Sequence, residues 1–302
     1  MLTVTIERRG EDGDEAEIHL HAGGQGFWIA RLVQELGVDS VLCGSFGGET
    51  GAVVRMLITS QDLEVQGVET AGSNGAYVHD RRSGERVELA HMAPTELSRH
   101  EVDDLYGVVV VEALESQVCV LGGPGQGTVV PADIYRRLAA DVRRNGGTIL
   151  ADLAGPPLPA ALQGGVDVLK MSDEELQREG FIRRRSRDEI VEAARKLTRS
   201  GAESVVISRE AEPVLALVDG EVLEFTTPTL EPLDDRGTGD SLTAGIAAAL
   251  ARGEGLAAAI RLGAAAGAIN VTRRGLATGR REEIERLSRH VDIDLERSGT
   301  TP

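Results

Sequence analysis

Alternating apolar and polar residues mark four short segments in the first hundred positions of the chain. Leu2–Arg8 and Glu17–His21 alternate on either side of an EDGD turn, which predicts a β-hairpin. A second pair, Ala76–Asp80 and Arg86–His91, is joined by RRSGE in the same way. The alternation therefore predicts a small sheet assembled from two separate parts of the chain.

From about Gln117 onward, short apolar runs alternate with amphipathic stretches. This order is typical of a parallel sheet with helices on both faces. The apolar runs are QVCVLGG, TILADL, VDVLK and ESVVIS, and the amphipathic stretches cover residues 131–145, 172–179 and 186–200. Residues 27–36, 240–251 and 256–272 also have helical spacing, whereas GVVVVEAL (107–114) fits a strand or a helix.

Together these patterns predict an α/β core and a smaller β-sheet lid. The lid comprises residues 1–22 and 72–95, and the core comprises residues 23–71 and 96–302. A small sheet above the carboxyl ends of parallel strands would cover the place where α/β proteins bind ligands.

The composition narrows the possible functions. The chain has 302 residues, 49 acidic against 32 basic residues and a formal net charge of −17, which argues against a nucleic-acid partner. Cys43 and Cys119 form no CxxC pair, so neither a disulfide framework nor a zinc site is indicated. Because no apolar run reaches the roughly 18 residues of a membrane span and no signal pattern precedes the first strand, we expect a soluble, cytoplasmic protein.

The most informative stretch is DDRGTGDSLTAGIAAALARG, residues 234–253. Gly237, Thr238 and Gly239 stand directly before a helix, where backbone N–H groups and the helix dipole favour an anion. Asp240 in the same turn is suited to remove a proton from an attacking hydroxyl. Taken alone, the turn has a simpler interpretation, in which an N-cap side chain precedes the helix and the glycines form a loop.

Two further Gly-rich segments occur near the N-terminus, and their order relative to residues 234–253 is informative. AGGQGFWIARLVQELG (22–37) is a second Gly-rich turn that leads into a helix, and CGSFGGETG (43–51) follows it. With RGTGDSLTAG, these turns resemble the PfkB-type, ribokinase-like sugar kinases over nearly the full chain, most of all the hexose-phosphate kinases such as 1-phosphofructokinase and tagatose-6-phosphate kinase. TILADLAG (148–155) and DVLKMSDEEL (167–176) are similar to the DxSG and KPNxxEL segments of that family.

The resemblance implies a ribokinase-like three-layer α/β/α fold with a mainly parallel sheet, and a transfer from ATP with Mg²⁺ to a hydroxyl of a sugar or sugar phosphate. It implies that Asp240 is the base, that residues 237–239 form the anion hole and that Glu175 organises Mg²⁺. The acceptor-binding residues implied are Gly23, Gly24, Gln25 and Trp28, and the nucleotide-binding residues implied are Lys170, Ser208, Arg209 and Asn270.

Three of these residues have alternative interpretations. Lys170 could be a strand-end lysine in solvent, and Asn270 could serve packing alone. Trp28 could fill space in the lid as readily as it could stack on a sugar or another ring.

The acceptor side departs from the family pattern. GGKGxN is replaced by GGQGFW (23–28), so that an amide stands in place of a cation. SNGAYV (73–78) has no arginine where the sugar-phosphate kinases usually carry one for the substrate phosphate, although Arg81 and Arg82 follow. These losses weaken the case for a phosphorylated acceptor.

The nucleotide side and the N-terminus depart as well. The SxGxxG turn of the family is replaced by SREAEP (208–213), which would weaken ATP binding unless Arg209 compensates, and SGSLP is replaced by GGPGQ (122–126). The first core strand of the family has no counterpart, which puts Thr3 near a sugar-binding Asp position and suggests that Met1 is not the true start.

Two functions from different classes are compatible with the sequence. The first is an active carbohydrate kinase, and the second is a non-catalytic descendant that binds a nucleotide or a sugar. A weaker third interpretation is a nucleoside acceptor that stacks on Trp28. Because lid sheets commonly pair in this family, the resemblance also implies a possible homodimer through the lid.

Overall fold

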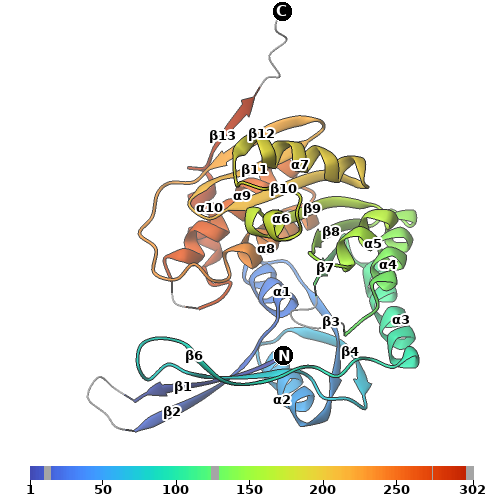
Figure 1. The fold of residues 1–302 in the computed structure, drawn as a ribbon, viewed down its shortest axis with the longest axis vertical. Coiled ribbons are helices and arrows are strands. Elements are labelled where there is room, and N and C mark those ends of the chain that lie inside the picture. The colour runs from blue at the N-terminus through green and yellow to red at the C-terminus, as the bar shows by residue number, and fades with distance from the viewer. Residues whose placement is uncertain (10–14, 124–128, 274, 297–302) are drawn as a thin grey trace, which may run out of the picture. The chain divides into compact units, whose positions relative to one another are not determined.

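The computed structural model describes residues 1–9, 15–123, 129–273 and 275–296 (Figure 1), so the EDGD turn and most of GGPGQ lie outside the described residues. The contacts within the chain divide it into two compact units. The smaller unit is built mainly from Met1–Phe27 and Ser40–Val109, and the larger from Trp28–Asp39, Val110–Gly123 and the residues after 130. The smaller unit thus contains both predicted lid segments and also residues 40–71.

The smaller unit holds a four-stranded sheet in the order β2-β1-β5-β6. Its strands are β1 (Leu2–Arg8), β2 (Ala16–Ala22), β5 (Ala76–Asp80) and β6 (Val87–Met92). β1 pairs antiparallel with β2 and parallel with β5, so both predicted segments contribute to one sheet. This is the discontinuous small sheet that the alternating pattern predicts.

The smaller unit also contains elements that the sequence pattern did not reveal. β3 (Val41–Gly47) and β4 (Glu64–Thr70) pair in parallel, with α2 (Gly48–Thr59) between them in the chain. The ambiguous segment GVVVVEAL lies in a helix, α3 (Arg99–Glu115). Although that segment is apolar, none of the helices in the described residues is long and apolar enough to cross a membrane.

The larger unit is built on a seven-stranded sheet in the order β13-β12-β11-β10-β9-β8-β7. Its parallel half consists of the four predicted apolar runs, β7 (Val118–Gly122), β8 (Thr148–Asp152), β9 (Val166–Ser172) and β10 (Ala202–Arg209). Three antiparallel strands that we did not predict extend it: β11 (Glu212–Val218), β12 (Glu221–Thr226) and β13 (Asp292–Glu296).

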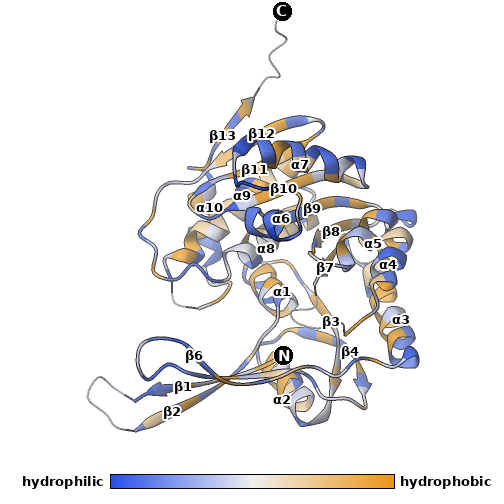
Figure 2. Ribbon diagram, in the orientation of Figure 1, coloured by the Kyte–Doolittle hydropathy of each residue, from blue (hydrophilic) through white to orange (hydrophobic). Residues whose placement is uncertain are grey.

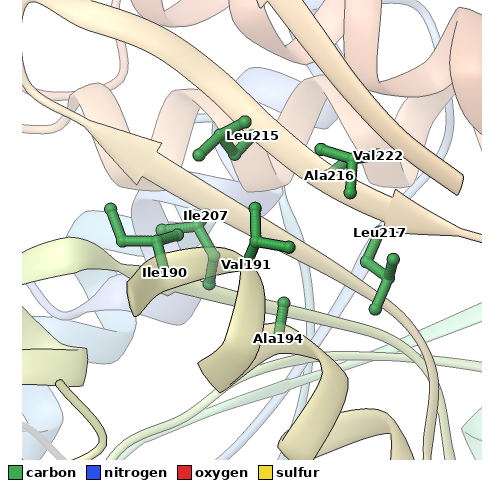
Figure 3. Close-up of a pocket in the computed structure, with 8 residues that line it drawn as sticks. All are labelled: Ile190, Val191, Ala194, Ile207, Leu215, Ala216, Leu217 and Val222. Atoms are coloured by element: carbon green, nitrogen blue, oxygen red, sulfur yellow. The ribbon is translucent and has the colours of Figure 1, made fainter. Parts of the chain in front are cut away.

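Helices cover both faces of this sheet, which gives the three-layer α/β/α architecture (Figure 1). The helices are α1 (Gln25–Glu35), α4 (Ala132–Arg144), α5 (Pro157–Gly164), α6 (Asp173–Arg178), α7 (Arg187–Arg199), α8 (Thr238–Ala251), α9 (Leu256–Val271) and α10 (Arg281–Ser288). On one face, Leu150, Val168 and Val206 join α1, α8, α9 and α10 in a single apolar core. On the other face, Ile190 and other aliphatic residues of α7 pack on β10 and β11 around a small pocket (Figure 3).

The hydropathy of the elements follows these layers. In Figure 2 the strands of the larger sheet carry much of the hydrophobic colour, whereas α6 is largely hydrophilic. α8 and α9 are rich in alanine and glycine, and Gly245 and Gly263 let them cross closely: a Cβ on Gly245 would lie 2.5 Å from the Cα of Gly263. The close crossing fixes the position of α8 against α9.

Candidate functional site

α8 begins at a glycine in a left-handed backbone conformation. Gly237 is the N-cap residue with φ 78°, and a Cβ at this position would lie 2.8 Å from the backbone nitrogen of Ala277. The N–H groups of the first turn of an α-helix have no intrahelical acceptor, and the N-cap Gly237 has no side chain to cap them. The hydroxyl of Thr238 donates to the carbonyl of Asp235 (2.6 Å), which leaves the backbone of this turn to meet an anion.

Asn270 of α9 holds the loop that precedes Gly237. Its Nδ2 donates to the carbonyl of Arg236 (2.7 Å), and its Oδ1 accepts from the backbone N–H of Thr278 (3.1 Å). The side chain is fully buried. The Asn270 side chain therefore lies inside the protein and connects two loops through its hydrogen bonds. This position agrees with the packing interpretation.

A buried ion pair lies beneath the same turn. Lys170 of β9 and Asp152 of β8 are register partners on adjacent parallel strands, and Nζ lies 3.1 Å from Oδ2. Their side chains are only 5% and 2% exposed, which rules out a lysine in open solvent. The hydroxyl of Thr243 donates to Asp152 Oδ2 (2.7 Å), and a Cβ on Gly239 would lie 2.8 Å from Lys170 Nζ. A positive charge therefore sits directly under the first turn of α8.

Three acids act on this lysine. Burial alone would lower the pKa of Lys170, but the carboxylates of Asp152, Glu175 and Asp240 outweigh it and raise the pKa above the usual value. Lys170 is therefore an ammonium ion at neutral pH. Carboxyl ends of parallel strands and a helix N-terminus meet here, which is where α/β proteins bind their ligands.

Sequence reasoning missed two members of this cluster, Asp152 and Thr243. Asp152 was visible as the acidic end of the apolar run TILADL, and VDVLK ends in one of only two lysines in the chain. Two oppositely charged residues at the ends of neighbouring buried strands are a signal for such a pair. Thr243 gave no signal, because a threonine within a small-residue helix is compatible with packing alone.

Glu175 is fixed by a capping box at the start of α6. Its Oε2 accepts from the backbone N–H of Ser172 (2.8 Å), and the Ser172 hydroxyl accepts from the N–H of Glu175 (3.1 Å). Within the described residues no group of three or more acidic, histidine or cysteine side chains is arranged to hold a metal ion. The donor set fits a Mg²⁺ ion bound by one or two carboxylates together with phosphate oxygens and water, and does not fit an all-protein cage.

Ser208 and Arg209, the two residues of β10 that we expected to contact the nucleotide, have different surroundings. Ser208, one residue before the end of β10, is the register partner of Ser172 of β9. Arg209 is only 8% exposed, its Nε donates to the carbonyl of Pro213 (2.6 Å), and its Nη2 lies 3.9 Å from Glu224. The guanidinium thus supports the turn between β10 and β11, and this placement does not favour the idea that Arg209 replaces the missing glycines.

The residues expected to bind the acceptor are divided between the two units. Gly23, Gly24 and Gln25 belong to the smaller unit, where a Cβ on Gly23 would lie 3.1 Å from the Thr3 hydroxyl. Trp28 belongs to the larger unit, packs against its apolar core and has the Arg31 guanidinium 5.2 Å from its ring centroid. Trp28 thus fills space beside the core of the larger unit and not in the lid, where we expected it.

The backbone of the Gly-rich segment CGSFGGETG is held in place by the side chain of Asn74 and by a close approach to Gly72. The Asn74 amide accepts from the N–H of Gly47 (2.8 Å) and donates to the carbonyl of Ser45 (2.9 Å). A Cβ on Gly47 would lie 1.9 Å from the carbonyl oxygen of Gly72. This close approach explains the glycine.

Comparisons with known proteins agree on one family. Residues 2–283 match the sequence model described as pfkB family carbohydrate kinase. The chain is 25% identical over 277 residues to 1-phosphofructokinase of Bacillus subtilis, covering 90% of this chain and 88% of that protein. It is 28% identical over 271 residues to ATP-dependent 6-phosphofructokinase isozyme 2 of Mycobacterium tuberculosis, covering 88% and 78%.

Solved structures show the same fold. Phosphofructokinase-2 of Escherichia coli in complex with potassium superposes with a TM-score of 0.80 at 22% identity, covering 95% of each chain. Ribokinase of Arabidopsis thaliana complexed with ribose and ATP superposes with a TM-score of 0.74 at 18% identity, again covering 95% of each chain. The predicted ribokinase-like fold is confirmed.

Proposed function

Because the chain belongs to the pfkB family of carbohydrate kinases, we propose that it transfers the γ-phosphoryl group of ATP to a sugar hydroxyl with Asp240 as the base. The chain is a sugar kinase, and its family implies that ATP is the phosphoryl donor. The assignment of roles to single residues is our own.

The observation that carries this proposal is the position of Lys170 under the turn that holds Asp240. Phosphoryl transfer places negative charge on the equatorial oxygens, and catalysis consists mainly of positioning and charge stabilisation. The backbone N–H groups of residues 237–239 and the ammonium of Lys170, 2.8 Å from the Cβ position of Gly239, supply positive potential at one point. Lys170 therefore acts through the turn and is a positioning residue.

Asp240 stands in the first turn of α8 and would accept the proton of the attacking hydroxyl. Glu175 would hold Mg²⁺ through water and through Oε1, which the capping box does not use and which lies 3.7 Å from Arg178 Nη2. When bound, Mg²⁺ neutralises phosphate charge and orients the transferred group. Ser208 and the neighbouring strand ends would contact the nucleotide, whereas Asn270 and Arg209 would act by fixing loops.

The acceptor would be bound by the turn of Gly23, Gly24 and Gln25. Gly24 has φ 110°, a backbone conformation that favours glycine, and it directly precedes the first residue of α1. Gln25 can donate and accept hydrogen bonds with hydroxyl groups.

ADP release with Mg²⁺–ATP over a panel of hexoses, pentoses, polyols, their phosphates and nucleosides tests this function. We expect release that depends on one class of acceptor. Absence of release in a folded protein that binds ATP would favour the non-catalytic alternative, whereas release that is independent of every acceptor would mean ATP hydrolysis and would contradict transfer to a sugar. Preference for a nucleoside would instead support the third interpretation.

We also propose that the small sheet pairs with a second copy of the chain. One face of this sheet carries Ile18, Leu20 and Met92, which are 65%, 49% and 41% exposed. An exposed apolar face of this kind is typical of an interaction surface. Light scattering should give a dimer, and Leu20→Arg should shift it toward the monomer; a monomeric unchanged protein would contradict the pairing.

A further inference from the structure

Four of the six histidines of the chain lie on the polar face of the small sheet. The strand register sets one residue from each strand side by side in a single row, which we call the polar row: His21, Thr3, Tyr77 and His91. Ring stacking agrees with the register, since the rings of Tyr77 and His91 lie 4.5 Å apart with 8° between their planes. His19 and His79 lie one row further along the same strands.

The polar row adjoins the turn that we assign to the acceptor. His21 is two residues before Gly23 on the same strand end, and a Cβ on Gly23 would lie 3.1 Å from the Thr3 hydroxyl. His21 and His91 are exposed, and Thr3 and Tyr77 are half-buried. The row therefore offers accessible polar groups that continue directly from the turn.

No lysine or arginine stands in this row, and the arginines beside it are engaged. Arg81 Nη1 lies 3.4 Å from Glu7, Arg82 Nη2 lies 2.7 Å from Asp80, and Arg86 Nη2 lies 2.6 Å from His79 Nε2. The next rows on the same face add carboxylates: the register places Glu7, Glu17 and Glu88 there. The face therefore carries three carboxylates, and the two arginines that reach it, Arg81 and Arg86, are already engaged with Glu7 and His79.

The histidine nearest the turn is neutral. Burial lowers the pKa of His21 and neighbouring His19 lowers it further, against the opposite influence of Glu7. A neutral imidazole both donates and accepts hydrogen bonds, as a sugar hydroxyl does. A phosphate monoester carries about −1.5 to −2 charges at pH 7 and is bound best by cationic donors, which this row does not provide.

We propose that the polar row binds an uncharged polyhydroxyl acceptor, so that this kinase uses a sugar or polyol without a phosphate group. The Tyr77 hydroxyl and the His91 imidazole extend the row with further groups that can form hydrogen bonds with hydroxyls. The inference rests on the proposed function and specifies its substrate class. It sets this chain apart from the phosphofructokinases that it resembles in sequence.

Matched pairs of a sugar and its phosphate test the proposal directly: glucose, fructose and ribose beside glucose 6-phosphate, fructose 6-phosphate, fructose 1-phosphate and ribose 5-phosphate, with mannitol as a polyol. Calorimetric binding and ADP release are both measured. We expect an uncharged member to exceed its phosphate at least about tenfold in kcat/KM, because the phosphate meets no cationic partner. A preference for the phosphate, or no binding and no turnover of any uncharged compound, overturns the proposal.

The two measurements separate this proposal from the proposed function. Binding of an uncharged sugar without ADP release would contradict the kinase assignment and leave the acceptor class supported. ADP release only with sugar phosphates would support the kinase assignment and contradict the uncharged acceptor class.

Variants of the row locate the recognition. His21→Asn and Tyr77→Leu should raise KM about 3- to 10-fold, the effect of losing or displacing a neutral hydrogen bond, and should change kcat less than KM. His19→Asn, one row further from Gly23, is the matched control and should change KM less than twofold. Equal effects of His19→Asn and His21→Asn, or none at either, would contradict the role of the row. Gln25→Lys should improve binding of the sugar phosphate.

Discussion

The ammonium nitrogen of Lys170 lies 3.1 Å from a carboxylate oxygen of Asp152, at the ends of two adjacent parallel strands. Both side chains are buried, so each charge depends on the other for compensation. Lys170 lies beneath Gly239, so the same ammonium group contributes to the stability of the fold and supplies positive charge at the first turn of α8.

Removing the cation should destabilise the protein strongly. Lys170→Met leaves the Asp152 carboxylate buried without its partner, which typically costs about 3–5 kcal/mol of the free energy of unfolding. The double variant Lys170→Met/Asp152→Leu should recover much of this stability, yet it should not recover turnover. Urea denaturation and ADP release measure the two effects, and a double variant as unstable as Lys170→Met would contradict the coupling.

Thr243 should matter through its hydroxyl alone. Thr243→Val leaves one oxygen of buried Asp152 without its 2.7 Å hydrogen bond, which should cost about 1–3 kcal/mol. Thr243→Ser keeps the hydroxyl and serves as the control. Thermal denaturation that shows equal losses for both variants would mean that packing of the methyl group, and not the hydrogen bond, explains this residue.

Two glycines with the same backbone angle separate conformational strain from crowding. Gly237 and Gly253 both have φ 78°, but a Cβ meets backbone atoms at 2.8 Å only at Gly237 and meets nothing within 4 Å at Gly253. Gly253→Ala should therefore cost only the left-handed conformation, about 1–2 kcal/mol, and keep turnover. Gly237→Ala should cost more and abolish turnover; similar activities of the two variants would argue against a shaped anion site.

Tyr135 should limit stability at high pH. Burial raises the pKa of Tyr135 to about 12, whereas an unfolded tyrosine ionises near 10. Since the unfolded state releases this proton first, stability is complete below pH 10 and falls by about 3 kcal/mol as the pH rises from 10 to 12. Tyr135→Phe should lack this part of the loss, as measured by urea denaturation at pH 9, 10 and 11; identical pH dependence in both proteins would contradict the assignment.

Much of the fold could be predicted from the pattern of the sequence. The four apolar runs became the parallel strands β7 to β10, because buried strands need continuous apolar residues. The antiparallel strands β11 to β13 could not be predicted in the same way: their partners are decided by chain reversals and by a segment as distant as Asp292–Glu296. GVVVVEAL formed a helix because its β-branched residues are overruled by the context of α3.

Only the part of the candidate site whose residues are neighbours in sequence could be recognised from the sequence. The turn before α8 could be recognised because its glycines and Asp240 are neighbours in sequence. The pairing of Lys170 with Asp152 depends on strand register, and the inward direction of Asn270 and Arg209 depends on packing. The expectation that these residues meet a nucleotide came from the family resemblance, which compares positions along the chain and does not include such long-range contacts.

The central claim is that Asp240 is the base of a phosphoryl transfer, and the acceptor-dependent rate of ADP release by Asp240→Asn tests it most directly. The asparagine keeps the shape of the side chain, so ATP binding by calorimetry and the urea midpoint should stay close to those of the unchanged protein. We expect kcat to fall by about 10²- to 10⁴-fold, the usual contribution of a general base. A folded Asp240→Asn variant that keeps its rate within a few-fold would contradict the account.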